Sequence, residues 1–199
     1  MITNPQFDLL INSFIENKIG IAPLFLNTAL MKGLRENILQ LKRDEQMKVS
    51  GIGNTVAGNT TNTLRGDQIY WMDKTHGNVF EQEFLLLADE FIAYLNQTCY
   101  AGINSCEFHY AIYEAGSFYK RHKDQFKNDS NRKYSLVSYL NEEWVEDDGG
   151  QLWVYGDETV RKILPHAQSA VFFNSEETEH EVTTAHRSRM SITGWLKRV

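Results

Sequence analysis

The C-terminal half of the chain, from about residue 107 to residue 198, contains short runs in which the side-chain type alternates from one residue to the next, a period of two. Residues 108–112 and 136–140 show such runs, and 189–195 places Arg189 and Ser191 on one face with Met190 and Ile192 on the other. Successive strand side chains point to opposite faces, so this pattern predicts β-strands. Clusters of Gly, Asn and Asp separate the runs, which favours several short strands in a sandwich or barrel.

The N-terminal third has helical periodicity instead. Asn4 precedes Pro5, a typical helix start, and apolar residues follow at helical spacing up to residue 15. We expect Pro23 to open a longer helix through residue 41, and a third helix to run from about Val79 to Gln97. Residues 1–48 are thus predicted to form a helical part that packs on the outside of a sheet. Residues 50–63 are small and polar, and we interpret them as a mobile loop.

Composition limits the class of protein. A length of 199 residues fits a single domain, 1–199. The net charge of −6 argues against a nucleic-acid partner. The two cysteines, Cys99 and Cys106, form no disulfide framework, so we expect small buried or partly buried side chains in a reducing cytoplasm. The sequence shows neither a signal peptide nor an apolar stretch near the ~20 residues of a membrane span, so we expect no membrane partner.

Three short pieces of the C-terminal half suggest chemistry. His122 and Asp124 form an H-x-D pair that lies on one face of a strand, and His180 can complete a set of three ligands. Two histidines and one carboxylate with open positions is the arrangement of non-haem Fe(II) oxygenases. Arg189 follows nine residues after His180 and offers a fixed cation for a carboxylate. An H-x-D pair alone is weak evidence, because a surface histidine is the commoner explanation.

The other histidines have simpler interpretations. His186 lies close to the motif, but the nine-residue step to Arg189 favours His180 as the ligand. We expect His76, His109 and His166 to be structural or solvated.

Several motifs together resemble a known family. They are Tyr113 to His122, Val137-Ser-Tyr139-Leu-Asn141, Gly149-Gly150, His180-Glu-Val and Arg189. This stretch resembles the 2-oxoglutarate/Fe(II) dioxygenases, in particular the prolyl 4-hydroxylase branch with the hypoxia-inducible-factor prolyl hydroxylases and their bacterial relatives. The upstream segment 65–71 resembles the Arg-Gly-Asp-x-Ile-x-Trp segment of those enzymes, so the similarity covers residues 49 to 198. The approach to His122 is one residue shorter than in the family, and Glu114 replaces the usual proline.

The resemblance implies an α+β fold. Its core would be a double-stranded β-helix, or jelly roll, over residues 107–198, braced by the N-terminal helices. It also implies Fe(II), 2-oxoglutarate as cosubstrate, O2 and ascorbate. The implied iron ligands are His122, Asp124 and His180, and the implied cosubstrate-binding residues are Arg189, Tyr139, Tyr113, Thr193 and Trp195.

The implied reaction is hydroxylation of a prolyl residue in a protein or peptide, such as a translation or transcription factor. The substrate would contact Arg65, Asp67, Trp71 and Arg132, and we expect Asp67 and Arg132 to form an ion pair across the mouth of the site. Two alternatives remain open, a small-molecule 2-oxoglutarate oxygenase and a non-catalytic metal-binding β-helix module. A closed zinc site fits poorly because no cysteine accompanies the motif.

Charged segments flank the motif. Basic residues cluster between 120 and 133, either to steer the dianionic cosubstrate or as a solvated face. Acidic residues between 142 and 148 form an expected surface turn.

Overall fold

Two antiparallel sheets form the body of the protein in a computed structural model, which describes residues 4–50, 64–125, 130–157 and 159–199. The larger sheet has the strand order β1-β9-β6-β11-β4-β3-β2, and the smaller has β5-β10-β7-β8. The strands are β1 (Ile19–Ala22), β2 (Lys48–Val49), β3 (Gln68–Trp71), β4 (Ser105–Tyr113), β5 (Tyr119–His122), β6 (Arg132–Tyr139), β7 (Leu152–Tyr155), β8 (Val160–Ile163), β9 (Ala170–Asn174), β10 (Glu179–Val182) and β11 (Arg189–Lys197). Nearly all of the loop expected at 50–63 lies outside the described residues.

The helices are α1 (Pro5–Asn17), α2 (Thr28–Arg43) and α3 (Val79–Cys99), with a short 3₁₀ turn, η1 (Glu146–Asp148). Each long helix starts after an asparagine whose side chain accepts hydrogen bonds from the first turn, as predicted for Asn4. The predicted start of the second helix at Pro23 is wrong. Pro23 lies in a turn after β1, and α2 begins where Asn27 accepts from the Leu30 N–H at 2.8 Å.

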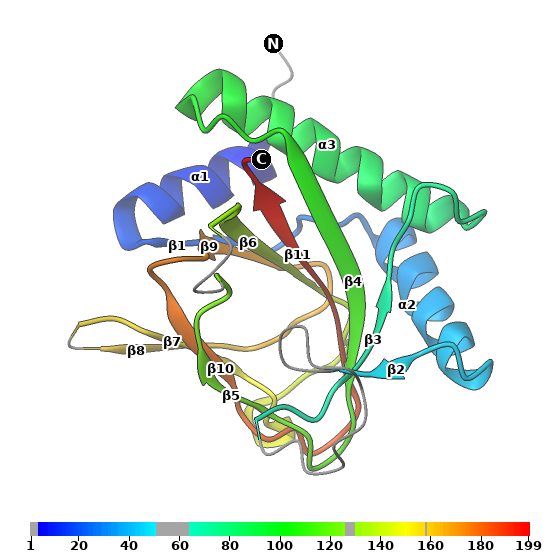
Figure 1. Ribbon diagram of the computed structural model, residues 1–199. Coiled ribbons are helices and arrows are strands. Elements are labelled where there is room, and N and C mark those ends of the chain that lie inside the picture. The colour runs from blue at the N-terminus through cyan, green and yellow to red at the C-terminus, as the bar shows by residue number, and fades with distance from the viewer. Residues whose placement is uncertain (1–3, 51–63, 126–129, 158) are drawn as a thin grey trace.

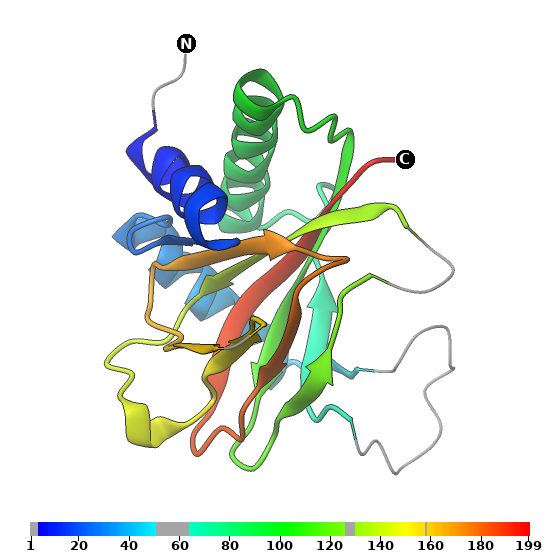
Figure 2. The ribbon, with the colours of Figure 1, turned by 90° about the vertical axis from the view of Figure 1, so that its left-hand side faces the viewer.

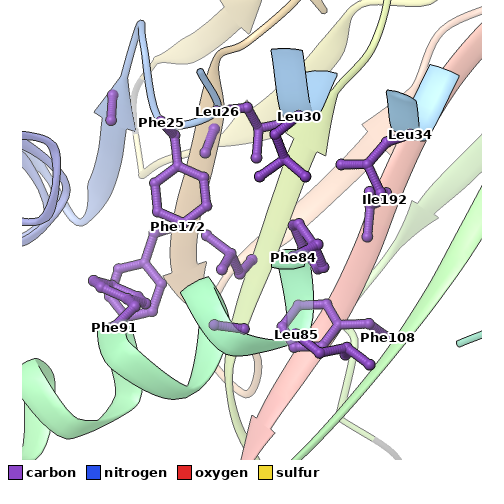
Figure 3. Packing of buried hydrophobic residues seen from close by; sticks show 14 of the residues in the cluster. Phe25, Leu26, Leu30, Leu34, Phe84, Leu85, Phe91, Phe108, Phe172 and Ile192 are labelled. Carbon is purple, nitrogen blue, oxygen red and sulfur yellow. The ribbon is translucent and has the colours of Figure 1, made fainter. Parts of the chain in front are cut away.

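The helices lie together on one side of the larger sheet, and the smaller sheet lies on the other side (Figures 1 and 2). Phe84 and Phe91 of α3 pack on Phe108 and Phe172 of the sheet, with ring centroids 5.2 and 5.4 Å apart (Figure 3). Gly33 allows the helices to approach, because a Cβ there would lie 2.3 Å from the Phe80 ring. The helices therefore brace the sheet through a continuous apolar layer.

Alternation along β11 separates this layer from the interior between the sheets. Ile192 and Leu196 belong to the core under the helices, whereas Arg189 and Ser191 lie on the opposite face of the strand. A second apolar cluster, which includes Val137 of β6 and Val154 of β7, fills the space between the sheets. The predicted α+β double-stranded β-helix braced by N-terminal helices is confirmed.

The helical N-terminal part also contributes a strand that was not predicted from the sequence. β1 pairs with β9 at the edge of the larger sheet, with Ile19 opposite Phe173. At the other edge, β2 and β3 extend the sheet beyond the predicted limits of 107–198. Cys106 is half-buried as expected, but Cys99 is exposed. Among the described residues, no helix is both long and apolar enough to cross a membrane.

Candidate active site

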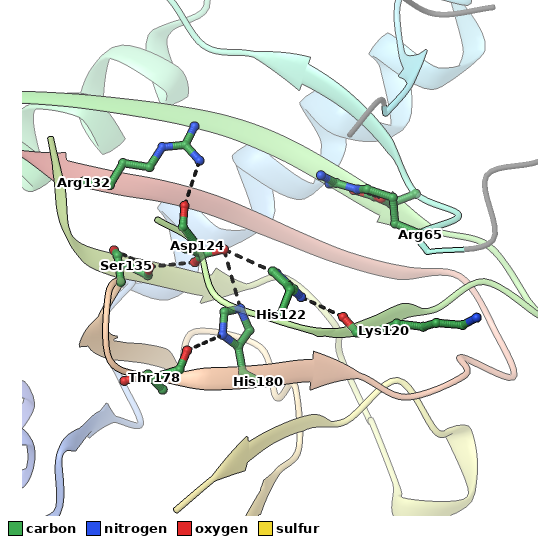
Figure 4. Close-up of polar contacts among 10 residues, drawn as sticks. Arg65, Lys120, His122, Asp124, Arg132, Ser135, Thr178 and His180 are labelled. Carbon is green, nitrogen blue, oxygen red and sulfur yellow. Dashed lines mark hydrogen bonds and ion pairs between the residues drawn. The ribbon is translucent and has the colours of Figure 1, made fainter. Parts of the chain in front are cut away.

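His122, Asp124 and His180 come together between the two sheets (Figure 4). β5 and β10 are paired so that His122 lies directly opposite His180, and Asp124 follows just after β5. Asp124 Oδ1 lies 3.4 Å from His122 Nε2 and 3.6 Å from His180 Nε2. One ligand atom from each residue lies within 4.8 Å of the others, a spacing that fits one metal ion.

The main chain orients both imidazole rings. His122 Nδ1 lies 2.7 Å from the Lys120 carbonyl oxygen, and His180 Nδ1 lies 3.2 Å from that of Thr178. A carbonyl oxygen only accepts, so each Nδ1 carries a proton, and in the neutral ring the Nε2 lone pair is then available to a metal. Such contacts fix the ring orientation and the tautomer that a metal ligand requires.

Asp124 is a buried carboxylate that stays ionised. Burial by itself would raise its pKa, but the neighbouring His180 and His122 and a hydrogen bond from Ser135 hold the pKa well below its ordinary value. Burial also lowers the pKa of His180, which keeps the ring neutral. A carboxylate and two imidazoles form a donor set suited to a divalent transition metal.

Arg65 and Asp67 pair with each other next to Tyr119, on the His122 side of the His-Asp-His group. The Asp67 carboxylate accepts from Arg65 Nε and Nη2 at 2.7 and 2.6 Å. The Arg65 guanidinium lies over the Tyr119 ring at 4.3 Å, and that ring stacks on His122 at 3.6 Å. Arg65 therefore supports the His122 ring through Tyr119.

The predicted ion pair between Asp67 and Arg132 is wrong. Arg132 instead donates to Glu107 Oε1 at 2.8 and 3.0 Å and stacks on Trp195 at 3.4 Å. Asp67 pairs with Arg65, and Arg132 pairs with Glu107. Glu107 lies on β4 opposite Trp195, the residue on which Arg132 stacks.

The rings of Trp71, His109 and Trp195 form an aromatic cluster at one end of the interior face, and Arg132 stacks on Trp195. The His109 ring lies 5.0 Å from Trp71 and 5.3 Å from Trp195. His109 is buried, which agrees with the structural and not the solvated alternative, and burial lowers its pKa to about 4. Trp71 is 46% exposed and brings this cluster to the surface.

Arg189 lies at the opposite end of the same face and is almost fully buried. Its Nε donates to the Gly150 carbonyl at 2.8 Å, and Nη1 donates to Ser191 Oγ at 3.3 Å. Its guanidinium lies 4.9 and 5.2 Å from the rings of Tyr113 and Tyr139. Within the described parts of the chain, Arg189 forms no ion pair, and a buried cation of this kind calls for an anionic ligand.

Comparisons with known proteins identify the family. Residues 108–197 match the model of the 2OG-Fe(II) oxygenase superfamily. The crystal structure of a Pseudomonas putida prolyl-4-hydroxylase is 31% identical in sequence, with a TM-score of 0.88 over 98% of this chain and 100% of that one. The chain belongs to the 2OG-Fe(II) oxygenase superfamily. Mouse prolyl hydroxylase EGLN3 is 27% identical over 86% of this chain and 74% of its own length.

A second solved structure extends the similarity to a substrate complex. A prolyl hydroxylase from Trichoplax adhaerens, in complex with a hypoxia-inducible-factor peptide fragment, is 27% identical, with a TM-score of 0.87 over 96% of this chain and 89% of that one. The protein is therefore a dioxygenase of prolyl-hydroxylase type that uses Fe(II), 2-oxoglutarate and O2.

The residues around Arg189 fit the cosubstrate of an oxygenase. The Tyr139 hydroxyl is buried and makes no hydrogen bond within the described residues. Burial raises the pKa of this hydroxyl, so it keeps its proton and can donate a hydrogen bond. Gly150 has a φ of +58°, and a Cβ there would lie 2.9 Å from Arg189 Cδ. The predicted Gly149-Gly150 entry to β7 thus leaves room for the arginine.

The remaining predicted residues occupy different parts of the oxygenase. Thr193 is half-buried between Val137 and His109 on the interior face. Trp195 lies in the aromatic cluster, six residues along β11 from Arg189. His186 and His166 are exposed and outside the metal group, whereas His76 contacts the buried Glu81 at 3.1 Å.

The charged segments are largely surface structure. Arg121, in the basic cluster, pairs with Glu179, and Lys127 lies outside the described residues. The acidic residues 142–148 form the expected surface turn, where Asp148 pairs with Arg187 at 3.0 Å.

Tyr119, Ser135 and the active-site position of His109 were not predicted from the sequence. A period of two counted back from Tyr139 places Ser135 on the interior face, and counting back from Tyr113 does the same for His109. The strand period thus predicts the face on which Ser135 and His109 lie. It does not predict the residues that they contact, because those residues belong to other parts of the chain.

Proposed function

We propose that the protein hydroxylates a prolyl residue in a protein substrate, with iron bound by His122, Asp124 and His180 and 2-oxoglutarate anchored by Arg189. The observation that carries the proposal is the 31% identity to a prolyl-4-hydroxylase over 98% of the chain. When bound, Fe(II) and 2-oxoglutarate supply the oxidation: O2 is consumed, the cosubstrate becomes succinate and CO2, and one oxygen atom enters a substrate C–H bond.

His122, Asp124 and His180 would hold the iron together. His122 and His180 present Nε2 from the paired strands β5 and β10, and Asp124, just after β5, presents Oδ1 beside both. Three protein ligands leave positions for the cosubstrate and for O2. The protein's role is to orient these groups and to shield them from water.

Arg189 binds the far carboxylate of 2-oxoglutarate. Its planar fork matches a carboxylate, and its low exposure of 1% strengthens the attraction. The Tyr139 hydroxyl, which is buried without a partner in the described chain, would donate a second hydrogen bond to the same carboxylate, and Tyr113 packs against the guanidinium. The anionic cosubstrate thereby compensates the buried charge.

The aromatic cluster receives the polypeptide. Trp71 offers an exposed ring beside His109, and Trp195 is held by the stacked Arg132. A pyrrolidine ring packs well on such aromatic faces. The Trichoplax adhaerens relative in its peptide complex supports a peptide as the substrate class.

The setting of the enzyme is part of the proposal. Cys99 and Cys106 are unpaired, which supports a reducing compartment, the cytoplasm. Ascorbate would serve to keep the iron as Fe(II).

The test compares two fractions of an extract of the protein's own cells. Purified protein with Fe(II), ascorbate and 2-oxoglutarate is incubated with the macromolecular fraction or the low-mass fraction, and succinate is quantified. The proposal predicts stimulation by the macromolecular fraction alone and none with His122→Ala. Stimulation by the low-mass fraction alone would indicate a small-molecule oxygenase instead.

A further inference from the structure

A buried serine holds one oxygen of the Asp124 carboxylate. Ser135 Oγ lies 2.6 Å from Asp124 Oδ2, and Ser135 has no exposed surface (Figure 4). The ionised carboxylate only accepts, so the Ser135 hydroxyl donates this bond. Charge-assisted bonds of this length are among the stronger ones in proteins.

The other carboxylate oxygen faces the histidines. Asp124 Oδ1 is the atom within 3.4 and 3.6 Å of the two Nε2 atoms. The two oxygens therefore have separate surroundings, one with Ser135 and one with the prospective metal. A carboxylate in this orientation offers a metal one oxygen and keeps the second in a hydrogen bond.

A second buried hydroxyl completes the arrangement. Ser175 Oγ lies 2.8 Å from Ser135 Oγ, and Ser175 is also fully buried. Because the single Ser135 proton goes to Asp124, the Ser175 hydroxyl must donate to Ser135. The direction of the chain is thus fixed as Ser175 to Ser135 to Asp124.

Main-chain hydrogen bonds link the segment around Ser175 to residues next to Asp124 and next to His180. The Ser175 carbonyl accepts from the Gln125 N–H at 3.1 Å, next to Asp124. Ser175 also lies in the turn where the Thr178 N–H donates to Asn174, and the Thr178 carbonyl contacts His180 Nδ1. The segment that carries Ser175 therefore contacts groups that position both Asp124 and His180.

We propose that Ser135, supported by Ser175, is a positioning residue that restricts Asp124 to binding iron through Oδ1 alone. This inference rests on the proposed metal ligands. Its consequence concerns the open coordination positions, because a carboxylate that swung to use both oxygens would occupy a position required by 2-oxoglutarate or O2. The serine pair thus protects the positions where the reaction takes place.

Ser135→Ala removes the donor, and strand β6 provides a matched control in Ser138→Ala. Ser138 is equally buried, and its Oγ has no partner among the described residues. Mn(II) affinity is measured anaerobically from the magnetic resonance signal of the free ion, and 2-oxoglutarate affinity is measured by calorimetry at saturating Mn(II). Ser175→Ala is a milder variant that keeps the Ser135 hydroxyl.

Ser135→Ala should weaken Mn(II) binding about 10-fold to 100-fold, the usual effect of losing a group that supports a ligand. It should also weaken 2-oxoglutarate binding at saturating metal, with Ser175→Ala intermediate and Ser138→Ala unchanged. If Ser135→Ala is too unstable to purify, the same comparison is made with Ser175→Ala.

A purely structural role would lower the melting temperature and leave both affinities intact, and that result would overturn the inference. Asp124→Ala distinguishes this failure from failure of the proposed function. Wild-type Mn(II) affinity in Asp124→Ala would mean that the metal site itself is elsewhere.

Discussion

Replacing Arg189 with methionine separates cosubstrate binding from folding. The guanidinium is 1% exposed and has no ion pair in the described chain, so methionine removes a buried charge and keeps much of the side-chain volume. The change leaves the Gly150 carbonyl and the Ser191 hydroxyl without a donor. An unsatisfied buried group costs about 1–3 kcal/mol, which the loss of the buried charge offsets. We expect an unfolding free energy within about 2 kcal/mol of the wild-type value.

The effect on 2-oxoglutarate should be much larger. A bidentate contact supplies two hydrogen bonds to a charged group, each contributing about 1.5–3 kcal/mol, so about 3–6 kcal/mol in all. At about 1.4 kcal/mol per factor of ten, affinity should fall about 100-fold to 10,000-fold. Arg189→Lys keeps the charge but loses the fork, so its affinity should fall less.

Calorimetric titration of 2-oxoglutarate into the Mn(II) form measures this loss, and urea unfolding of the apo form measures stability. Arg161→Met, at an exposed position on β8, is the matched control. Wild-type affinity in a folded Arg189→Met variant would refute the assignment of Arg189 as the carboxylate anchor.

Two further predictions concern stability. Burial lowers the pKa of His109 from 6.5 to about 4, so the unfolded chain binds a proton that the native chain does not. His109 thus contributes stability that is complete above pH 6.5 and declines by about 3 kcal/mol as the pH falls to 4, and His109→Leu should flatten this part of a urea-unfolding pH profile; an unchanged profile would contradict the burial argument. Gly194→Ala places a Cβ 2.0 Å from the Phe108 ring and should cost about 1–3 kcal/mol by urea unfolding, whereas Gly77→Ala, with no atom within 4 Å, should cost little; equal costs would show that the strand adjusts.

The sequence predicted the features that depend on local pattern. The period of two in 189–195 correctly placed Arg189 and Ser191 opposite Met190 and Ile192, because alternation in a strand depends only on backbone geometry. Asn4 before Pro5 located the first helix for a similar reason.

Features that depend on partners distant in the chain could not be predicted in this way. The four residues of β1 are a strand because β9 pairs with them, and such a short run carries no period of its own. The family resemblance predicted an ion pair between Asp67 and Arg132. In the structure, Asp67 pairs with Arg65 and Arg132 pairs with Glu107. Ser135 shows the same limit, since its role depends on where Asp124 and Ser175 meet it.

Mass spectrometry of proteins from the organism's own cells tests the central claim most directly. Extract is treated with purified protein, Fe(II), ascorbate and 2-oxoglutarate under ¹⁸O2, with His122→Ala as the control. The account predicts one labelled oxygen atom on a specific proline, present only with the intact enzyme. Labelled oxygen on another residue type, or succinate formation without any labelled protein, would contradict prolyl hydroxylation.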